Sequence, residues 1–178
     1  IGPLEADFGW NRATTSSAMT AFLISYSLSA FTMGRLGDSY GPRLVVSVGG
    51  LLAAAGFMLA SIIGNIWELR LALFLSGMGA GSCWAVPSAA VQRWFVKRRG
   101  LAMGLMGTGV GLGALIMVPL ASYLVESYGW RTTYLILGIG FLVLIVSGAQ
   151  FLVHSPERKR MRPYGDEGQD NGPSITVA

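Results

Sequence analysis

The sequence is poor in charge and in the side chains that build catalytic or metal sites. Only 12% of its 178 residues are charged, against about 25% in soluble domains. Its single cysteine, Cys83, excludes an internal disulfide and a cysteine-based metal cluster. With one histidine, His154, and no carboxylate inside the apolar stretches, a Ser–His, Cys–His or metal constellation is excluded. We therefore expect no enzyme, no cofactor and no bound metal.

Hydrophobic residues take the place of charge, at 52% of the chain. Five apolar stretches lack Asp, Glu, Lys and Arg, and each exceeds the roughly 18 residues of a transmembrane candidate. Lipid offers the backbone no hydrogen-bond partners, so such segments cross as helices. The sequence predicts an all-α membrane protein with five transmembrane helices, at about residues 14–34, 44–67, 71–92, 101–125 and 132–153.

Polar segments flank this bundle, which is expected over residues 14–154. Residues 1–13 indicate an extracytoplasmic connector, and residues 155–178 a flexible cytoplasmic linker or tail with several Pro and Gly. The chain begins with Ile1 and shows no signal peptide. We expect it to be truncated and to follow a helix that is missing.

Positive charge is divided unequally between the two ends of the spans. One side carries ten basic residues: Arg35, Arg43, Arg93, Lys97, Arg98, Arg99, Arg158, Lys159, Arg160 and Arg162. The other side carries three: Arg12, Arg70 and Arg131. The positive-inside rule places the first group in the cytoplasm, with the N-terminus outside and the C-terminus inside. The net charge of +4 is therefore a topology signal with anionic-lipid contacts, and no nucleic acid is expected as a partner.

The connector between the first two spans has the most informative pattern, GRLGDSYGPR over residues 34–43. Glycine suits a tight turn with positive φ, and proline suits the start of a helix. Asp38 is expected near the start of the following helix, where a carboxylate suits the positive end of the helix dipole. Taken alone, the pattern predicts a turn with charged anchors.

This segment resembles motif A of the major facilitator superfamily, G-x-L-x-D-x-x-G-x-R. Its five specified positions are filled by Gly34, Leu36, Asp38, Gly41 and Arg43. The resemblance implies that the spans correspond to helices two to six of a twelve-helix transporter. The fold would then be a partial N-terminal six-helix bundle, whose partners are the missing first helix and the second six-helix half of the same chain.

Three further segments are similar to the monocarboxylate porter and oxalate/formate antiporter branches: DFGWNRA at 7–13, RWFVKRRGLAMG at 93–104 and YGWR at 128–131. The resemblance implies a secondary active transporter of small organic anions such as monocarboxylates. It would work by alternating access, with proton symport or anion exchange, in a plasma (bacterial inner) membrane. The alternative is a five-span membrane scaffold or interaction protein without transport activity.

The resemblance also implies that Asp38 pairs with Arg93, at the inner end of the fourth helix, and holds the inside closed. The gating set is then Gly34, Arg35, Asp38, Gly41, Arg43 and Arg93. Independent surface anchoring of the two residues is the alternative.

Tyr26, Cys83, Trp84 and Thr108 are candidates for the substrate cavity, since Tyr and Trp can present a polar edge in an apolar pocket. Packing between helices is the alternative for each of them. Glycines four residues apart, Gly77 with Gly81 and Gly107 with Gly111, are expected to allow close helix contact.

Overall fold

We analysed a computed structural model, which describes residues 2–95 and 98–150. The described residues are helical almost throughout, as expected for an all-α protein. The elements are α1 Gly2–Phe8, α2 Arg12–Tyr40, α3 Pro42–Ala60, α4 Ile66–Trp94 and α5 Arg99–Ala149. The expected tail at 155–178, His154 and the basic residues Lys97, Arg158, Lys159, Arg160 and Arg162 lie outside the described residues.

Side-chain caps set the starts of two long helices. Asn11 Oδ1 accepts a hydrogen bond of 2.7 Å from the backbone N–H of Thr14 at the start of α2. Before α4, Asn65 and Glu68 form a capping box, in which each side chain accepts from the backbone N–H of the other residue. These caps satisfy backbone donors that helix starts leave unpaired.

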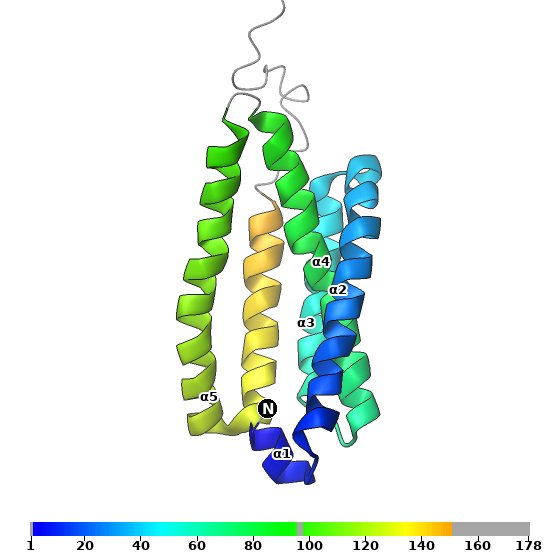
Figure 1. The fold of residues 1–178 in the computed structure, drawn as a ribbon, viewed down its shortest axis with the longest axis vertical. Helices are drawn as coiled ribbons and strands as arrows, with labels where there is room; N and C mark the ends of the chain where they lie inside the picture. Colours follow the sequence, from blue (N-terminus) through cyan, green and yellow to red (C-terminus); the bar gives the residue numbers. More distant parts are fainter. Residues whose placement is uncertain (1, 96–97, 151–178) are drawn as a thin grey trace, which may run out of the picture.

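Helix α5 contains 51 residues but doubles back on itself (Figure 1). Gly129 interrupts its helical geometry with φ 77° and ψ 165°, a conformation that L side chains rarely adopt. We call residues 99–128 the first arm and 130–149 the second arm. The first arm contains the span that the sequence predicts at 101–125, and the second arm contains residues 132–149 of the span predicted at 132–153, whose residues 151–153 lie outside the described part of the chain.

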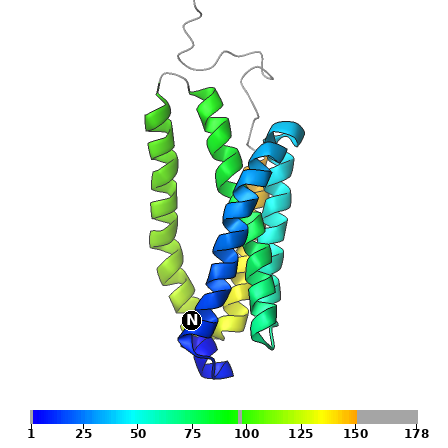
Figure 2. The same cartoon turned by 45° about the vertical axis from the view of Figure 1, so that its right-hand side comes forward.

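The helices pack in the order α2, α4, α3 and second arm, while the first arm stands apart in both ribbon views (Figure 1, Figure 2). Helix α4 is central because it contacts α2 on one face and α3 on another. Phe57 of α3 packs edge-on against Phe141 of the second arm, with ring centroids 5.1 Å apart.

Small residues allow α4 to approach both neighbours closely. A Cβ on Gly77 would lie 2.1 Å from Ser25 Oγ, and one on Gly81 would lie 2.1 Å from Ser29 Oγ, both on α2. On the other face, Ser76 donates a hydrogen bond of 3.2 Å to the carbonyl of Ala53 in α3. The expectation for Gly77 and Gly81 therefore matches a contact with α2.

The glycines of the first arm differ from that expectation. A Cβ built on Gly107 or Gly111 meets no atom within 4 Å among the described residues. The reason is that the first arm lies beside no other helix over most of its length (Figure 2). These glycines make no interhelical contact in the described part of the chain.

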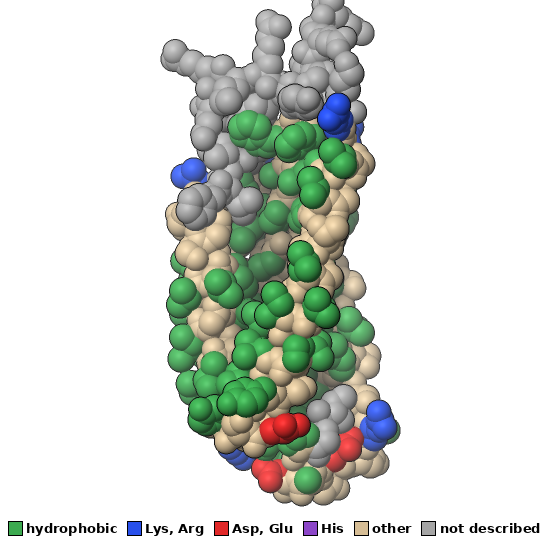
Figure 3. Space-filling view, turned by 90° about the vertical axis from the view of Figure 1, so that its left-hand side faces the viewer, with side chains coloured by type: hydrophobic (Ala, Val, Ile, Leu, Met, Phe, Trp, Pro, Cys, Tyr) green, Lys and Arg blue, Asp and Glu red, His purple; other side chains and the backbone are tan. Residues whose placement is uncertain are grey.

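Helices α3, α4 and α5 are each long and apolar enough to cross a membrane. Helix α2 is less apolar because serines and threonines recur along it, including the buried Ser25 and Ser29. Side chains on the face of the first arm are mostly hydrophobic, and Arg, Asp and Glu gather at the two ends (Figure 3). This distribution suits a helical bundle that spans a bilayer.

Candidate functional site

The candidate site lies at the end of the bundle where α2 finishes. We expected residues 35–43 to form a connector with Asp38 near the start of the next helix. That placement is wrong, because α2 continues to Tyr40 and Asp38 lies in its last turn. Gly41 alone separates α2 from α3, with φ 91° and ψ 148°, and Pro42 is the first residue of α3. A glycine with positive φ ends the helix, and proline can only start a new one.

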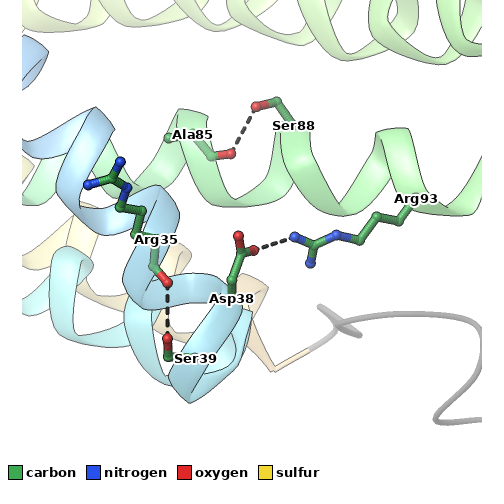
Figure 4. Close-up of polar contacts among 6 residues, drawn as sticks. All are labelled: Arg35, Asp38, Ser39, Ala85, Ser88 and Arg93. Atoms are coloured by element: carbon green, nitrogen blue, oxygen red, sulfur yellow. Dashed lines mark hydrogen bonds and ion pairs between the residues drawn. The ribbon is translucent and has the colours of Figure 1, made fainter.

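The last turn of α4 brings an arginine to the same place (Figure 4). Arg93 Nη2 donates to Asp38 Oδ1 in an ion pair that joins residues 55 positions apart in the sequence. The side chains are 36% and 56% exposed, respectively. Exposed ion pairs contribute roughly 0–1 kcal/mol, so this pair can bias a conformational balance without dominating the stability of the fold.

Close approach of α2 and α4 positions the two charged residues. Gly37 is buried one residue before Asp38, and a Cβ there would lie 3.1 Å from the methyl groups of Val86 in α4. Further along the same seam, Ser29 Oγ donates a hydrogen bond of 3.3 Å to the carbonyl of Gly77. The sequence patterns did not point to Gly37, Val86 or Ser29 as site residues. The sequence does contain a pattern that indicates this contact: Ser25 and Ser29 are four residues apart, as are Gly77 and Gly81.

The other motif residues lie at the end of α2 and the start of α3. The guanidinium of Arg35 lies over the ring of Phe31, 4.3 Å from its centroid, and Ser39 donates to the carbonyl of Arg35 (Figure 4). Arg43 is exposed on the first turn of α3. A Cβ on Gly34 would meet nothing within 4 Å. The structure thus brings Asp38 and Arg93 together and gives Gly41 a backbone role.

The four cavity candidates lie on three parts of the bundle: α2, α4 and the first arm. Tyr26 stacks on Phe22 within α2, with ring centroids 6.2 Å apart. Cys83 is half-buried near α3, and its neighbour Trp84 is 36% exposed. Thr108 lies exposed on the first arm, where its hydroxyl donates to the carbonyl of Leu105. A shared substrate cavity therefore stays a prediction for these residues.

Metal-ligating side chains do not cluster in the described ranges: no three His, Cys, Asp or Glu residues there could hold one ion. Within the described residues, we therefore take the Asp38–Arg93 ion pair and the close contact between α2 and α4 as the candidate functional site. The ion pair can act electrostatically on the relative position of the ends of α2 and α4.

Comparison with known proteins agrees with this architecture. The family profile described as Major Facilitator Superfamily matches residues 1–175. Monocarboxylate transporter 13 of Rattus norvegicus is 40% identical over 115 residues, which cover 64% of this chain and 27% of the relative. Monocarboxylate transporter 14 of Mus musculus is 33% identical over 158 residues, which cover 85% of this chain and 31% of the relative. Monocarboxylate transporter 11 of Homo sapiens is 34% identical over 146 residues, which cover 80% of this chain and 31% of the relative.

The chain thus spans less than a third of the length of these relatives. The match of the family profile nevertheless runs along almost all of its residues. The chain belongs to the major facilitator superfamily.

Proposed function

We propose that this chain is part of the first half of a secondary active transporter for small organic anions such as monocarboxylates. The Asp38–Arg93 ion pair is the observation that carries the proposal, because it ties the ends of α2 and α4 at the superfamily motif. The family and the names of the relatives support transport. Proton symport or anion exchange, by alternating access around a midplane site, is the mechanism that we propose.

The proposed orientation follows from charge. The end with Asp38 and Arg93 is cytoplasmic, and the end with α1 faces outward, in a plasma (bacterial inner) membrane. The ion pair then holds the cytoplasmic ends of α2 and α4 in one arrangement. A second six-helix half docks against them when the inside is closed. Breaking the pair shifts the balance between inward-open and outward-open states.

The substrate anion needs a positive partner that this chain does not place at mid-membrane. The Arg, Asp and Glu residues of the described helices lie near helix ends or the kink at Gly129. An unpaired charge in the bilayer centre costs several kcal/mol. We infer that the pairing cation comes from the missing first helix or from the second half.

The test uses the complete transporter in proteoliposomes with a radiolabelled monocarboxylate. Asp38→Asn keeps the shape of the side chain but removes its charge, and Arg93→Gln removes the other charge. We expect the inward-to-outward population ratio, read by spin-label distances, to change by up to about fivefold, since about 1 kcal/mol is lost. Exchanging the two charges in an Asp38→Arg, Arg93→Asp double variant should restore part of the ratio.

Ser39→Ala is the matched control, because it alters the same turn without touching the ion pair. Unchanged populations and transport in both single-charge variants would remove the gating role. Absence of any anion transport by the complete wild-type protein would remove the transporter itself. A five-span scaffold would then be the better description.

A further inference from the structure

Arg70 has no carboxylate partner among the described residues. It lies in the second turn of α4, at the end of the bundle that carries α1, and is half-buried. Its Nε and Nη2 donate hydrogen bonds of 3.0 and 2.8 Å to one neutral acceptor, Ser17 Oγ on α2. Its guanidinium also lies 4.5 Å from the ring centroid of Trp67. These contacts hold the cation in place while leaving its charge uncompensated.

An apolar groove of about 640 Å³ lies between α3 and α4 on the same half of the bundle. Leu71, Phe74, Leu75 and Met78 of α4 form one wall, and Leu59 of α3 with Ile62 of the following loop form another. Leu71 and Ile62 are about 70% exposed, at 69% and 72%. The volume falls within the roughly 300–1,000 Å³ that is usual for small-molecule sites.

The cation and the groove are adjacent along α4. Residues four apart on a helix are neighbours on its surface, so Arg70 lies one turn from Phe74, and Trp67 one turn from Leu71. Trp67 is 67% exposed and marks the level of the membrane interface at this end. A lipid headgroup at Arg70 would therefore lie about one helical turn from Phe74, at the edge of the apolar groove.

The other edge of the groove carries a negative charge, the carboxylate of Glu68, which already accepts hydrogen bonds from the loop before α4. Glu68 lines the groove, but its Oε2 accepts from the backbone N–H of Gly64 at 2.6 Å and its Oε1 accepts from Asn65 Nδ2 at 2.7 Å. This carboxylate repels an anion on the loop side of the groove. A phosphate is therefore better placed on the side of Arg70, away from Glu68.

We propose that Arg70 and the α3–α4 groove form a binding site for an anionic phospholipid of the leaflet at the α1 end. The phosphate pairs with the guanidinium of Arg70, next to Trp67, and one acyl chain lies in the groove. The guanidinium has five donors and uses two on Ser17, so donors are left for phosphate oxygens, which it matches well. The inference rests on membrane insertion and is independent of the transported substrate.

The test measures lipid retention by the complete transporter, purified in detergent and analysed by native mass spectrometry with added phosphatidylglycerol. Arg70→Gln should lower the affinity for phosphatidylglycerol by about tenfold or more, the usual worth of a hydrogen bond to a charged group. Arg70→Lys should retain part of the affinity. Arg12→Gln, which changes an exposed arginine at the same end, should retain all of it.

The groove is tested separately. Met78→Trp fills it, and Leu71→Gln adds a polar group to an exposed wall without crowding the helices. Both should weaken phosphatidylglycerol binding, and inorganic phosphate at millimolar concentration should not displace the lipid. Equal binding by wild type and Arg70→Gln would overturn the proposal. So would displacement by phosphate with no effect of either groove variant, since that result would describe a site for free anions.

Discussion

The indole Nε1 of Trp130 donates a hydrogen bond of 2.8 Å to Oδ2 of Asp7. This contact ties α1 to the start of the second arm, across 123 positions of sequence. Trp130 is only 7% exposed and packs with Leu4, while its ring lies 5.9 Å from that of Phe8. Helix α1, with only seven residues, is thereby held against the end of the bundle by a donor that is buried among apolar groups.

Removing this acceptor should destabilise the protein. Asp7→Ala removes the acceptor of a part-buried hydrogen bond to a charged group, and because Asp7 is exposed to water the loss should be about 0.5–1.5 kcal/mol. Asp7→Asn keeps an oxygen that can accept and should lose less than half of that amount. Thermal unfolding of the complete protein in detergent, followed by tryptophan fluorescence, measures both. Equal stability of the two variants would mean that the hydrogen bond is unimportant for docking α1.

The seam between α2 and α4 should not tolerate an added methyl group. In Gly77→Ala the new Cβ would lie 2.1 Å from Ser25 Oγ and 2.4 Å from the backbone carbonyl of Phe22. Backbone must move, and overpacking of this kind costs about 1–3 kcal/mol. Gly140→Ala is the control, because nothing lies within 4 Å of its Cβ position, and its stability should stay within about 0.5 kcal/mol of wild type. The same unfolding assay applies, and an equal loss in both variants would contradict the packing described above.

The turn between α2 and α3 should depend on glycine at position 41. Its φ of 91° and ψ of 148° lie where a side chain is strained, at a cost of about 1–3 kcal/mol. Gly41→Ala should therefore lower stability by that amount, although no atom lies within 4 Å of the Cβ position. Gly34→Ala, in a helical conformation with similar open space, should be nearly neutral. A stable Gly41→Ala variant would indicate a different turn.

The Asp38–Arg93 pair should show measurable coupling. In a double-mutant cycle with Asp38→Ala and Arg93→Ala, the expected interaction free energy is about 0.2–1 kcal/mol, as for other exposed ion pairs. Raising the ionic strength should reduce it, because exposed charges are screened. Coupling near zero at low salt would show that the two side chains act independently. The measurement is chemical unfolding of the four proteins in the same detergent.

The sequence alone determined the class of the protein. Long uncharged stretches force helices in a bilayer, and motif A with its spacing predicted the superfamily that the family profile confirms. It also pointed to Arg93 as the partner of Asp38, through the resemblance. These conclusions depend on amino-acid composition and on the order of residues along short segments, and neither depends on how the chain folds.

Tertiary structure decided what the local pattern could not. Asp38 lies at the end of α2 because the break comes at Gly41, and the pattern GRLGDSYGPR is compatible with a turn at any of its glycines. Gly77 and Gly81 are four residues apart, as are Gly107 and Gly111. Within the described part of the chain, a Cβ on Gly77 would meet α2, whereas one on Gly107 would meet no atom within 4 Å. The side chain of Arg70 pairs with the neutral hydroxyl of Ser17 on α2, 53 positions earlier in the sequence, so its charge has no carboxylate partner among the described residues. Which faces meet depends on the packing of whole helices, and that packing is a property of the folded bundle.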